Sequence, residues 1–118
     1  MPSIVFLGVD RFEVIEKVLH EGLNVSYFVT YQTESKIIQF LSKLRLPWSL
    51  FQYDEIRESL EYYYLNLISH ISSCDALVVL DWNLKIHDNF FNYYKDKIIL
   101  GENLNTDEIL QEIKNKVQ

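Results

Sequence analysis

The sequence predicts an α/β domain with a mostly parallel five-stranded sheet. Two short apolar runs, residues 3–8 and 24–30, lie on either side of a helical pattern near the N-terminus. Residues 76–80 form an apolar run without alternation, which is typical of a parallel strand buried on both faces. Strand and helix patterns alternate five times along the chain, so right-handed crossovers predict helices on both faces of the sheet, in a Rossmann-like three-layer sandwich.

The first half of the chain contains two helix patterns between its predicted strands. The first helix is expected over about residues 11–21, with Asp10 as its N-cap and Gly22 as the glycine that ends it. Its apolar residues recur on one face: Phe12, Ile15, Val18 and Leu19. A second amphipathic helix is predicted over residues 35–44, followed by a short strand at residues 49–53.

The second half continues the alternation. Asp54 is expected to cap a long helix that ends at residues 72–75, just before the apolar run of the central strand. Residues 88–94 are expected to contain a short helix, and residues 97–100 form a fifth strand that ends at a glycine. The last helix begins at a capping box, and its spacing gives it one apolar face; the residues involved are Asn105, Glu108, Ile109, Leu110, Ile113 and Val117.

Length and composition limit the class of protein. A chain of 118 residues fits a single α/β domain spanning residues 1–118. The net charge of −6 disfavours nonspecific binding to nucleic acid and to anionic membranes. No apolar stretch reaches the roughly 20 residues of a membrane span, and no signal peptide is expected at the N-terminus. The single cysteine, Cys74, excludes an internal disulfide framework and is expected to be a buried, inert thiol, which fits a cytoplasmic location.

The turn after the first strand is expected to be a poor cradle for phosphate. Residues 8–12 read Gly-Val-Asp-Arg-Phe and lack the three glycines of the dinucleotide-binding fingerprint. Asp10 places a carboxylate at the helix N-terminus, where a pyrophosphate would otherwise bind. A plain helix cap is one interpretation of Asp10; in the other, Asp10 or Arg11 lines a pocket at the edge of the sheet.

The loop after the central strand is the segment that best suits a ligand. Asp81, Trp82 and Asn83 could bind a flat heterocycle, because an indole stacks on it while an acid and an amide form hydrogen bonds. Glu102 and Asn103 follow the last strand and should lie beside this loop, since parallel strands end at one edge of the sheet. An ordinary solvated turn is the alternative interpretation.

Acidic residues at this edge offer a second kind of chemistry. Asp10, Asp81 and Glu102 could converge, raise one another's pKa and serve as acid–base groups. They could also hold a magnesium ion, although nothing in their spacing requires one. We favour three unrelated exposed acids, and we predict no metal site and no cofactor. His87 is the one histidine that we consider for catalysis, because the other two lie near predicted helix C-termini, where a positive charge suits the helix dipole.

A run of three tyrosines suggests an interface. Tyr62, Tyr63 and Tyr64 fall within the long predicted helix and cover most of its circumference, so they cannot all face the core. At least one ring is therefore expected to be exposed, and exposed tyrosine is common where proteins meet. The segment suits a homodimer or a protein partner; packing over neighbouring surface residues is the alternative.

Three segments resemble the N-terminal half of the formyltransferases that use formyltetrahydrofolate. Residues 4–8, with Phe12 beyond them, look like that family's first strand and turn. Residues 24–30 resemble its second strand, and residues 75–86 resemble its buried strand and folate-contacting loop, with Trp82 at an aromatic position. The resemblance implies a Rossmann-like fold and a pocket for a heterocycle.

The same resemblance implies that this sequence lacks the catalytic residues of the family. The family carries an Asn-x-His pair at the end of the following strand, where this sequence has Leu100 and Glu102. The family's aspartate would come from a segment beyond the last residue given. We therefore expect a shortened relative that does not transfer formyl groups.

Two classes of function follow from these observations. The preferred one is a non-catalytic Rossmann-like module that binds a small heterocyclic ligand at the sheet edge, or a protein through the tyrosine-rich helix. The alternative is a small enzyme that acts on a nucleoside, nucleotide or sugar through carboxylates at the same edge. Glycosidic-bond cleavage is the version of the enzyme that needs fewest groups, because a carboxylate nucleophile and a stacking aromatic ring would suffice.

Overall fold

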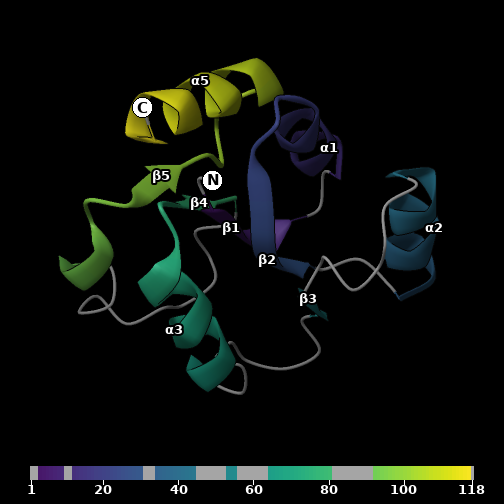
Figure 1. Cartoon of the computed structure of the whole chain (residues 1–118), viewed down its shortest axis with the longest axis horizontal. Coiled ribbons are helices and arrows are strands. Elements are labelled where there is room, and N and C mark those ends of the chain that lie inside the picture. The colour runs from purple at the N-terminus through teal and green to yellow at the C-terminus, as the bar shows by residue number, and fades with distance from the viewer. Residues whose placement is uncertain are drawn as a thin grey trace.

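The computed structural model describes residues 3–9, 12–30, 34–44, 53–55, 64–80 and 92–117 (Figure 1). The elements follow in the order β1 (Ser3–Val9), α1 (Phe12–His20), β2 (Asn24–Thr30), α2 (Glu34–Leu44), β3 (Tyr53–Glu55), α3 (Tyr64–Ser73), β4 (Ala76–Val79), β5 (Ile98–Leu100) and α5 (Thr106–Val117). Parallel pairings join the strands in the order β3-β2-β1-β4-β5. The predicted α/β class with a parallel sheet is confirmed, and the strand order is compatible with a Rossmann-like sheet.

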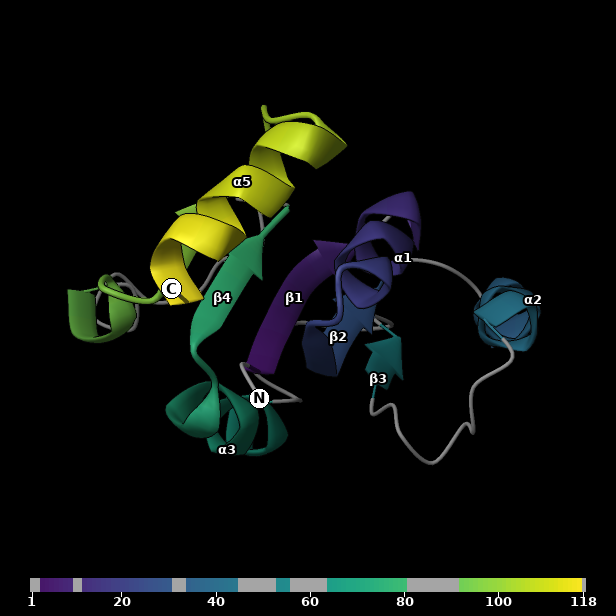
Figure 2. The ribbon, with the colours of Figure 1, turned by 45° about the horizontal axis from the view of Figure 1, so that its top comes forward.

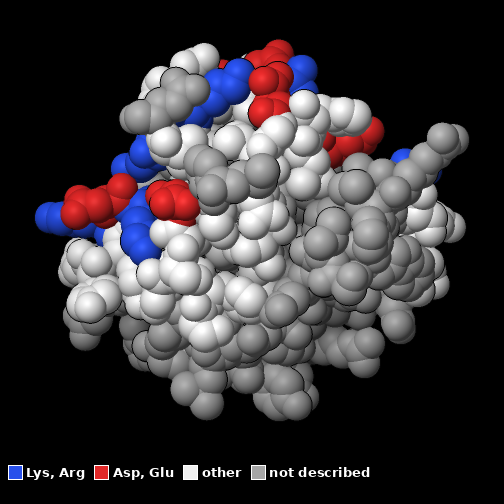
Figure 3. Space-filling model, viewed as in Figure 1, with Lys and Arg blue, Asp and Glu red and all other residues white. Residues whose placement is uncertain are grey.

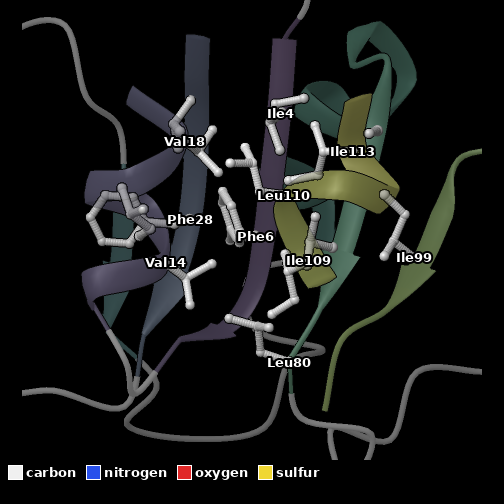
Figure 4. Packing of buried hydrophobic residues seen from close by; sticks show 14 of the residues in the cluster. Ile4, Phe6, Val14, Val18, Phe28, Leu80, Ile99, Ile109, Leu110 and Ile113 are labelled. Carbon is white, nitrogen blue, oxygen red and sulfur yellow. The ribbon is translucent and has the colours of Figure 1, made fainter. Parts of the chain in front are cut away.

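Alternate residues of the central strand face opposite sides of the sheet. In β1, Ile4 and Phe6 belong to a core that α1, α2 and α5 cover, as Figure 4 shows for part of the cluster. Val5 and Leu7 belong to a second core, to which α3 contributes Ile71. Figure 2 shows α1 and α5 on one side of the sheet and α3 on the other. Helices therefore cover both faces, and β1 is buried on both, as parallel sheets require.

The end of α1 is set by Gly22, as the sequence predicts. Gly22 has a positive φ of 80°, a conformation that glycine adopts without the steric cost of a side chain. Its N–H donates to the carbonyl of Leu19 at 3.0 Å, and the N–H of Leu23 donates to the carbonyl of Val18 at 3.3 Å. These are the two hydrogen bonds of a Schellman motif, which satisfies carbonyl groups that the helix leaves without partners.

The start of α5 is the predicted capping box. The N–H of Glu108 donates to Oδ1 of Asn105 at 2.8 Å, and the N–H of Asn105 donates to Oε1 of Glu108 at 3.1 Å. Two free backbone donors are thereby satisfied at once. The helix then buries its predicted apolar residues Ile109, Leu110 and Ile113 against the sheet.

Two sequence-based expectations about the strands are wrong. β1 does not end at Gly8, because Gly8 lies inside the strand with φ 76° and shifts its register against β2, as a β-bulge does. Asp54 does not cap a helix, because it lies in β3 and pairs with Val29 of β2. Strand pairing with a distant segment thus determines the conformation of Asp54, although the residue type favours helix caps.

Charged side chains of both signs alternate over α5 and over the residues that precede β5, on the face seen in Figure 3. Two ion pairs join the region of α1 to α5: Lys17 of α1 lies 3.5 Å from Asp107, and Glu21, which follows α1 directly, lies 3.1 Å from Lys114. None of the helices in the described ranges combines the length and the apolar character needed to cross a membrane.

Candidate functional site

A hollow of about 300 Å³ opens at the carboxyl ends of β4 and β5. Among the described residues it is lined by Val79, Leu100, Glu102 and Asn103. Val79 and Leu100 are paired neighbours at the ends of their strands, so the two strands deliver them side by side. This is the edge at which parallel α/β sheets bind ligands, and it lies one strand away from the reversal of strand order between β1 and β4.

Gly101 determines how closely the loop after β5 approaches the core. Its N–H donates to the carbonyl of Val79 at 2.9 Å, so the chain is still bonded to β4 as it leaves the sheet. A Cβ at this position would lie 3.0 Å from Cδ2 of Leu80 and 3.3 Å from Cγ1 of Ile109. Glycine therefore allows the buried close approach that brings the next two residues to the mouth of the hollow.

Glu102 and Asn103 are the two middle residues of a tight turn. The N–H of Leu104 donates to the carbonyl of Gly101 at 3.2 Å and closes this turn. Both turn residues are exposed, so their side chains are open to a ligand. A carboxylate accepts hydrogen bonds from amino and hydroxyl groups, and an amide both donates and accepts them.

The rest of the lining is apolar. The Leu100 side chain is 56% exposed, which is unusual for a large aliphatic residue at the end of a core strand. Val79, in contrast, is 1% exposed and forms the floor of the hollow. An apolar surface with two polar groups at its rim suits a flat ring that carries hydrogen-bonding substituents.

The structure places only part of the predicted site. Glu102 and Asn103 line the hollow, as the expectation of a site at this edge requires. The other candidates lie outside the described residues: Asp10, Arg11, Asp81, Trp82, Asn83, His87, Tyr62 and Tyr63. Tyr64 is the first residue of α3. The predicted convergence of three carboxylates therefore stays a prediction.

Leu100 and Val79 were not foreseen as lining residues. In the sequence both residues belong to the apolar runs of predicted strands, and neither residue type indicates that its side chain is exposed. The signal that would have found Leu100 is the position of β5 at the edge of the sheet, which only the strand order reveals. An edge strand has a neighbour on one side, so its last side chain can remain open to solvent.

Cys74 is a buried thiol, as expected. It is 4% exposed, and its Sγ lies 3.2 Å from the carbonyl of Ile71, to which the thiol donates. Burial raises the pKa of this thiol to about 11, the ammonium of Lys97 lowers it in part, and the carboxylate of Asp75 raises it further. A thiol with so high a pKa is a poor nucleophile at neutral pH.

The two described histidines lie in different surroundings. His70 stacks on the buried ring of Tyr27, with 4.4 Å between ring centroids and 10° between planes. His20 lies at the exposed end of α1, 3.6 Å from Glu16. Within the described ranges, no three side chains of His, Cys, Asp or Glu lie together in a way that could hold a metal ion.

Comparison of the chain with protein-family models, with curated proteins and with solved structures found no match.

Proposed function

We propose that this protein is a non-catalytic, Rossmann-like binding module whose ligand is a small neutral heterocycle of the nucleoside class. One observation carries the proposal: a hollow of about 300 Å³ lies at the carboxyl ends of two neighbouring parallel strands. Its volume is at the lower end of the range for small-molecule sites, so it suits one ring system with a modest substituent.

The charge at the rim favours a neutral ligand over a phosphorylated one. Glu102 contributes a negative charge, and the described lining contains no cation. A phosphate would be repelled by this carboxylate, whereas the hydroxyl groups of a ribose or the amino group of a base would donate hydrogen bonds to it. Asn103 would pair with a base edge that presents both a donor and an acceptor.

The segment that follows β4 supports the same proposal from the sequence. Trp82 would stack on the ring of the ligand, and Asp81 and Asn83 would add hydrogen bonds. The resemblance to formyltransferases adds a second ligand of similar shape, the pterin ring of a folate. Formyl transfer is not part of the proposal, because Leu100 and Glu102 stand where the family has its Asn-x-His pair.

The thermal stability of the protein with a panel of ligands tests the proposal. The panel contains adenosine, guanosine, cytidine and uridine, their 5′-monophosphates, nucleotide sugars and folates. A ligand at 100-fold its dissociation constant adds about 2.7 kcal/mol of stability, which raises the melting temperature of a domain of this size by about 10 °C. We expect a nucleoside or a folate to give this shift, and the monophosphate of the same nucleoside to give a smaller one.

Variants then assign the shift to the hollow. Asn103→Ala and Glu102→Gln should reduce it, whereas Glu112→Gln, an exposed carboxylate on α5, should leave it unchanged. Equal shifts in all three variants would place the ligand elsewhere. Flat responses to the whole panel would exclude the proposed ligand class.

A nucleoside-cleaving enzyme is the second candidate, because the Glu102 carboxylate lines the hollow. In most glycosidases a second carboxyl group lies within about 10 Å of the first, a role that we assign to Asp81. Chromatography of each nucleoside after long incubation would reveal a free base if the enzyme exists. Loss of that product in Glu102→Gln, together with retained binding, would establish the enzyme over the binding module.

A further inference from the structure

A second hollow, of about 390 Å³, lies at the opposite end of the β4–β5 pair. Among the described residues it is lined by Ser72, Tyr93, Tyr94, Asp96 and Lys97. Ser72 is in the last turn of α3, and the other four precede β5, so two segments far apart in the sequence build it. It is separate from the hollow at the carboxyl edge, and the inference from it does not depend on the proposed function.

Tyr93 is the most exposed large apolar residue in the described part of the chain. Its side chain is 81% exposed. Its ring meets that of Tyr94 edge to face, with 4.8 Å between centroids and 80° between planes. This contact orients the Tyr93 ring and leaves most of its surface in water, so the ring is an aromatic platform at the edge of the hollow.

The wall beside the platform is held in place by hydrogen bonds. Nζ of Lys97 donates to the carbonyl groups of Ile71 and Ser72, each at 3.1 Å, and so binds the end of α3 to the start of β5. The hydroxyl groups of Ser72 and Tyr94 lie 3.4 Å apart. These hydrogen bonds hold three of the five lining residues, Ser72, Tyr94 and Lys97, in place.

Side chains of opposite charge lie close together at this hollow. The Asp96 carboxylate is exposed and forms no ion pair with any described residue. The Lys97 ammonium donates two of its three N–H groups to the carbonyl groups, and its Nζ also lies 5.9 Å from the centroid of the Tyr94 ring; the third N–H forms no hydrogen bond to a described residue. Lys116 donates to the Asp96 backbone carbonyl at 2.6 Å. Because charges of both signs lie within the same few residues, neither an anion nor a cation is favoured.

We propose that this hollow binds a neutral sugar of the pyranose class. The apolar C–H face of a pyranose stacks on an exposed aromatic ring, whose face is partly negative. Its hydroxyl groups donate to the carboxylate of Asp96 and accept from the third N–H of Lys97. Any charged ligand would meet a group of its own sign here: a phosphate would face Asp96, and a guanidinium or ammonium would face Lys97 and Lys116.

Titration of the uniformly ¹⁵N-labelled protein, followed by NMR, tests the proposal. The probes are the methyl glycosides of glucose, galactose and mannose, with inorganic phosphate and arginine methyl ester as the charged comparisons. We expect a saturable shift of the amide signals of residues 93–97 with at least one glycoside, and no comparable shift of residues 100–103. A stronger saturable response to phosphate or to the arginine ester, or no saturable response to any glycoside, overturns the proposal.

Two variants identify the groups that bind. Tyr93→Ala removes an exposed ring and should leave the fold intact while it weakens glycoside binding by about tenfold. Asp96→Asn should weaken it by a smaller factor, because the amide keeps one acceptor oxygen. Gln39→Ala, which removes an exposed side chain on α2, is the control and should leave glycoside affinity unchanged. Unchanged affinity in Tyr93→Ala, with a native spectrum, would refute the role of the aromatic platform.

Discussion

Ser3 and Asp75 exchange hydrogen bonds in both directions. The N–H of Ser3 donates to Oδ2 of Asp75 at 2.8 Å, and the N–H of Asp75 donates to the carbonyl of Ser3 at 2.8 Å. The pair joins the amino ends of β1 and β4, the two central strands between which the strand order reverses. Seventy-two residues of sequence separate them, so the contact closes a long loop at the point where the sheet is assembled.

Asp75→Ala should destabilise the protein by about 1 kcal/mol, because a hydrogen bond to a charged acceptor is lost at a partly solvated position. Asp75→Asn should cost less, since the amide oxygen can still accept. Urea unfolding measures both. Glu112→Ala, an exposed acid on α5, is the control and should stay within about 0.5 kcal/mol of the parent. Equal stability of all three variants would show that the side-chain bond contributes nothing.

The capping box gives a second stability prediction. Asn105→Ala removes the acceptor for the Glu108 N–H and should cost about 1 kcal/mol. Asn115→Ala is the matched control in the same helix, since Asn115 accepts one exposed hydrogen bond from Gln111 and caps nothing. Thermal unfolding of the two variants should separate them clearly. A loss in Asn115→Ala as large as that in Asn105→Ala would contradict the assigned cap.

Local signals explain which parts of the fold were predictable. Gly22 and Asn105 end and begin helices through contacts within a few residues, so their roles can be read from spacing alone. The apolar run of β4 was equally clear, because burial on both faces removes all alternation. The same reasoning gives a wrong prediction for Asp54, because its pairing with Val29 in β2 is a long-range contact that overrides the local preference of aspartate for helix caps.

The residues of the two hollows also differ in how far the sequence predicts their positions. Glu102 and Asn103 could be placed at the carboxyl edge of the sheet because they follow a strand directly. The exposure of Leu100 could not be predicted, since it follows from the edge position of β5. The second hollow could not be predicted from the sequence either, because the tyrosines before β5 and the end of α3 come together only in the folded chain.

Cys74 gives a prediction about pH. Its thiol has a pKa of about 11 in the folded protein, against an ordinary value of 9.0, and burial is the main cause. The unfolded chain therefore loses this proton at a lower pH than the folded one, so stability falls as the pH rises from about 9 to about 11. Below pH 9 the thiol is protonated in both states and contributes no pH dependence.

Urea unfolding at several pH values checks this expectation. The stability of the parent should fall more steeply between pH 9 and pH 11 than that of Cys74→Ala, by an amount on the order of 2 kcal/mol. Comparison of the two proteins cancels the titration of lysines and tyrosines in the same range. The folded parent should also react slowly with a thiol reagent at neutral pH and rapidly in urea. Fast reaction in the absence of urea would mean that the thiol is accessible.

Ser26 lies where the register of β2 against β1 shifts between Ile4 and Val5. Its Oγ is buried and has no hydrogen-bond partner among the described residues. Ser26→Ala removes this hydroxyl, so we expect a gain of about 1 kcal/mol in thermal or urea unfolding. Ser73→Ala is the control, because the Ser73 hydroxyl is exposed and hydrogen-bonded, and its loss should give no gain. Destabilisation by Ser26→Ala would reveal a partner for the hydroxyl.

Glycine is favoured at positions 101 and 22 for different physical reasons, and substitution of each by alanine distinguishes the two reasons. At Gly22 a Cβ would meet no atom within 4 Å, so the cost of about 1 kcal/mol comes from the positive φ alone. At Gly101 a Cβ would lie 3.0 Å from Leu80 and 3.3 Å from Ile109, so overpacking should cost about 1–3 kcal/mol. The measurement is urea unfolding of both variants.

The hollow beside Gly101 offers a second comparison of the two variants. Because Glu102 and Asn103 follow Gly101 directly, relief of the crowding in Gly101→Ala must move the turn that carries them. We therefore expect Gly101→Ala to weaken binding of any nucleoside or folate that stabilises the parent, while Gly22→Ala, at the far end of α1, leaves its affinity unchanged. Parent-like affinity in Gly101→Ala would mean that Leu80 and Ile109 yield instead of the turn. The close approach of Gly101 to the core would then serve packing and not the hollow.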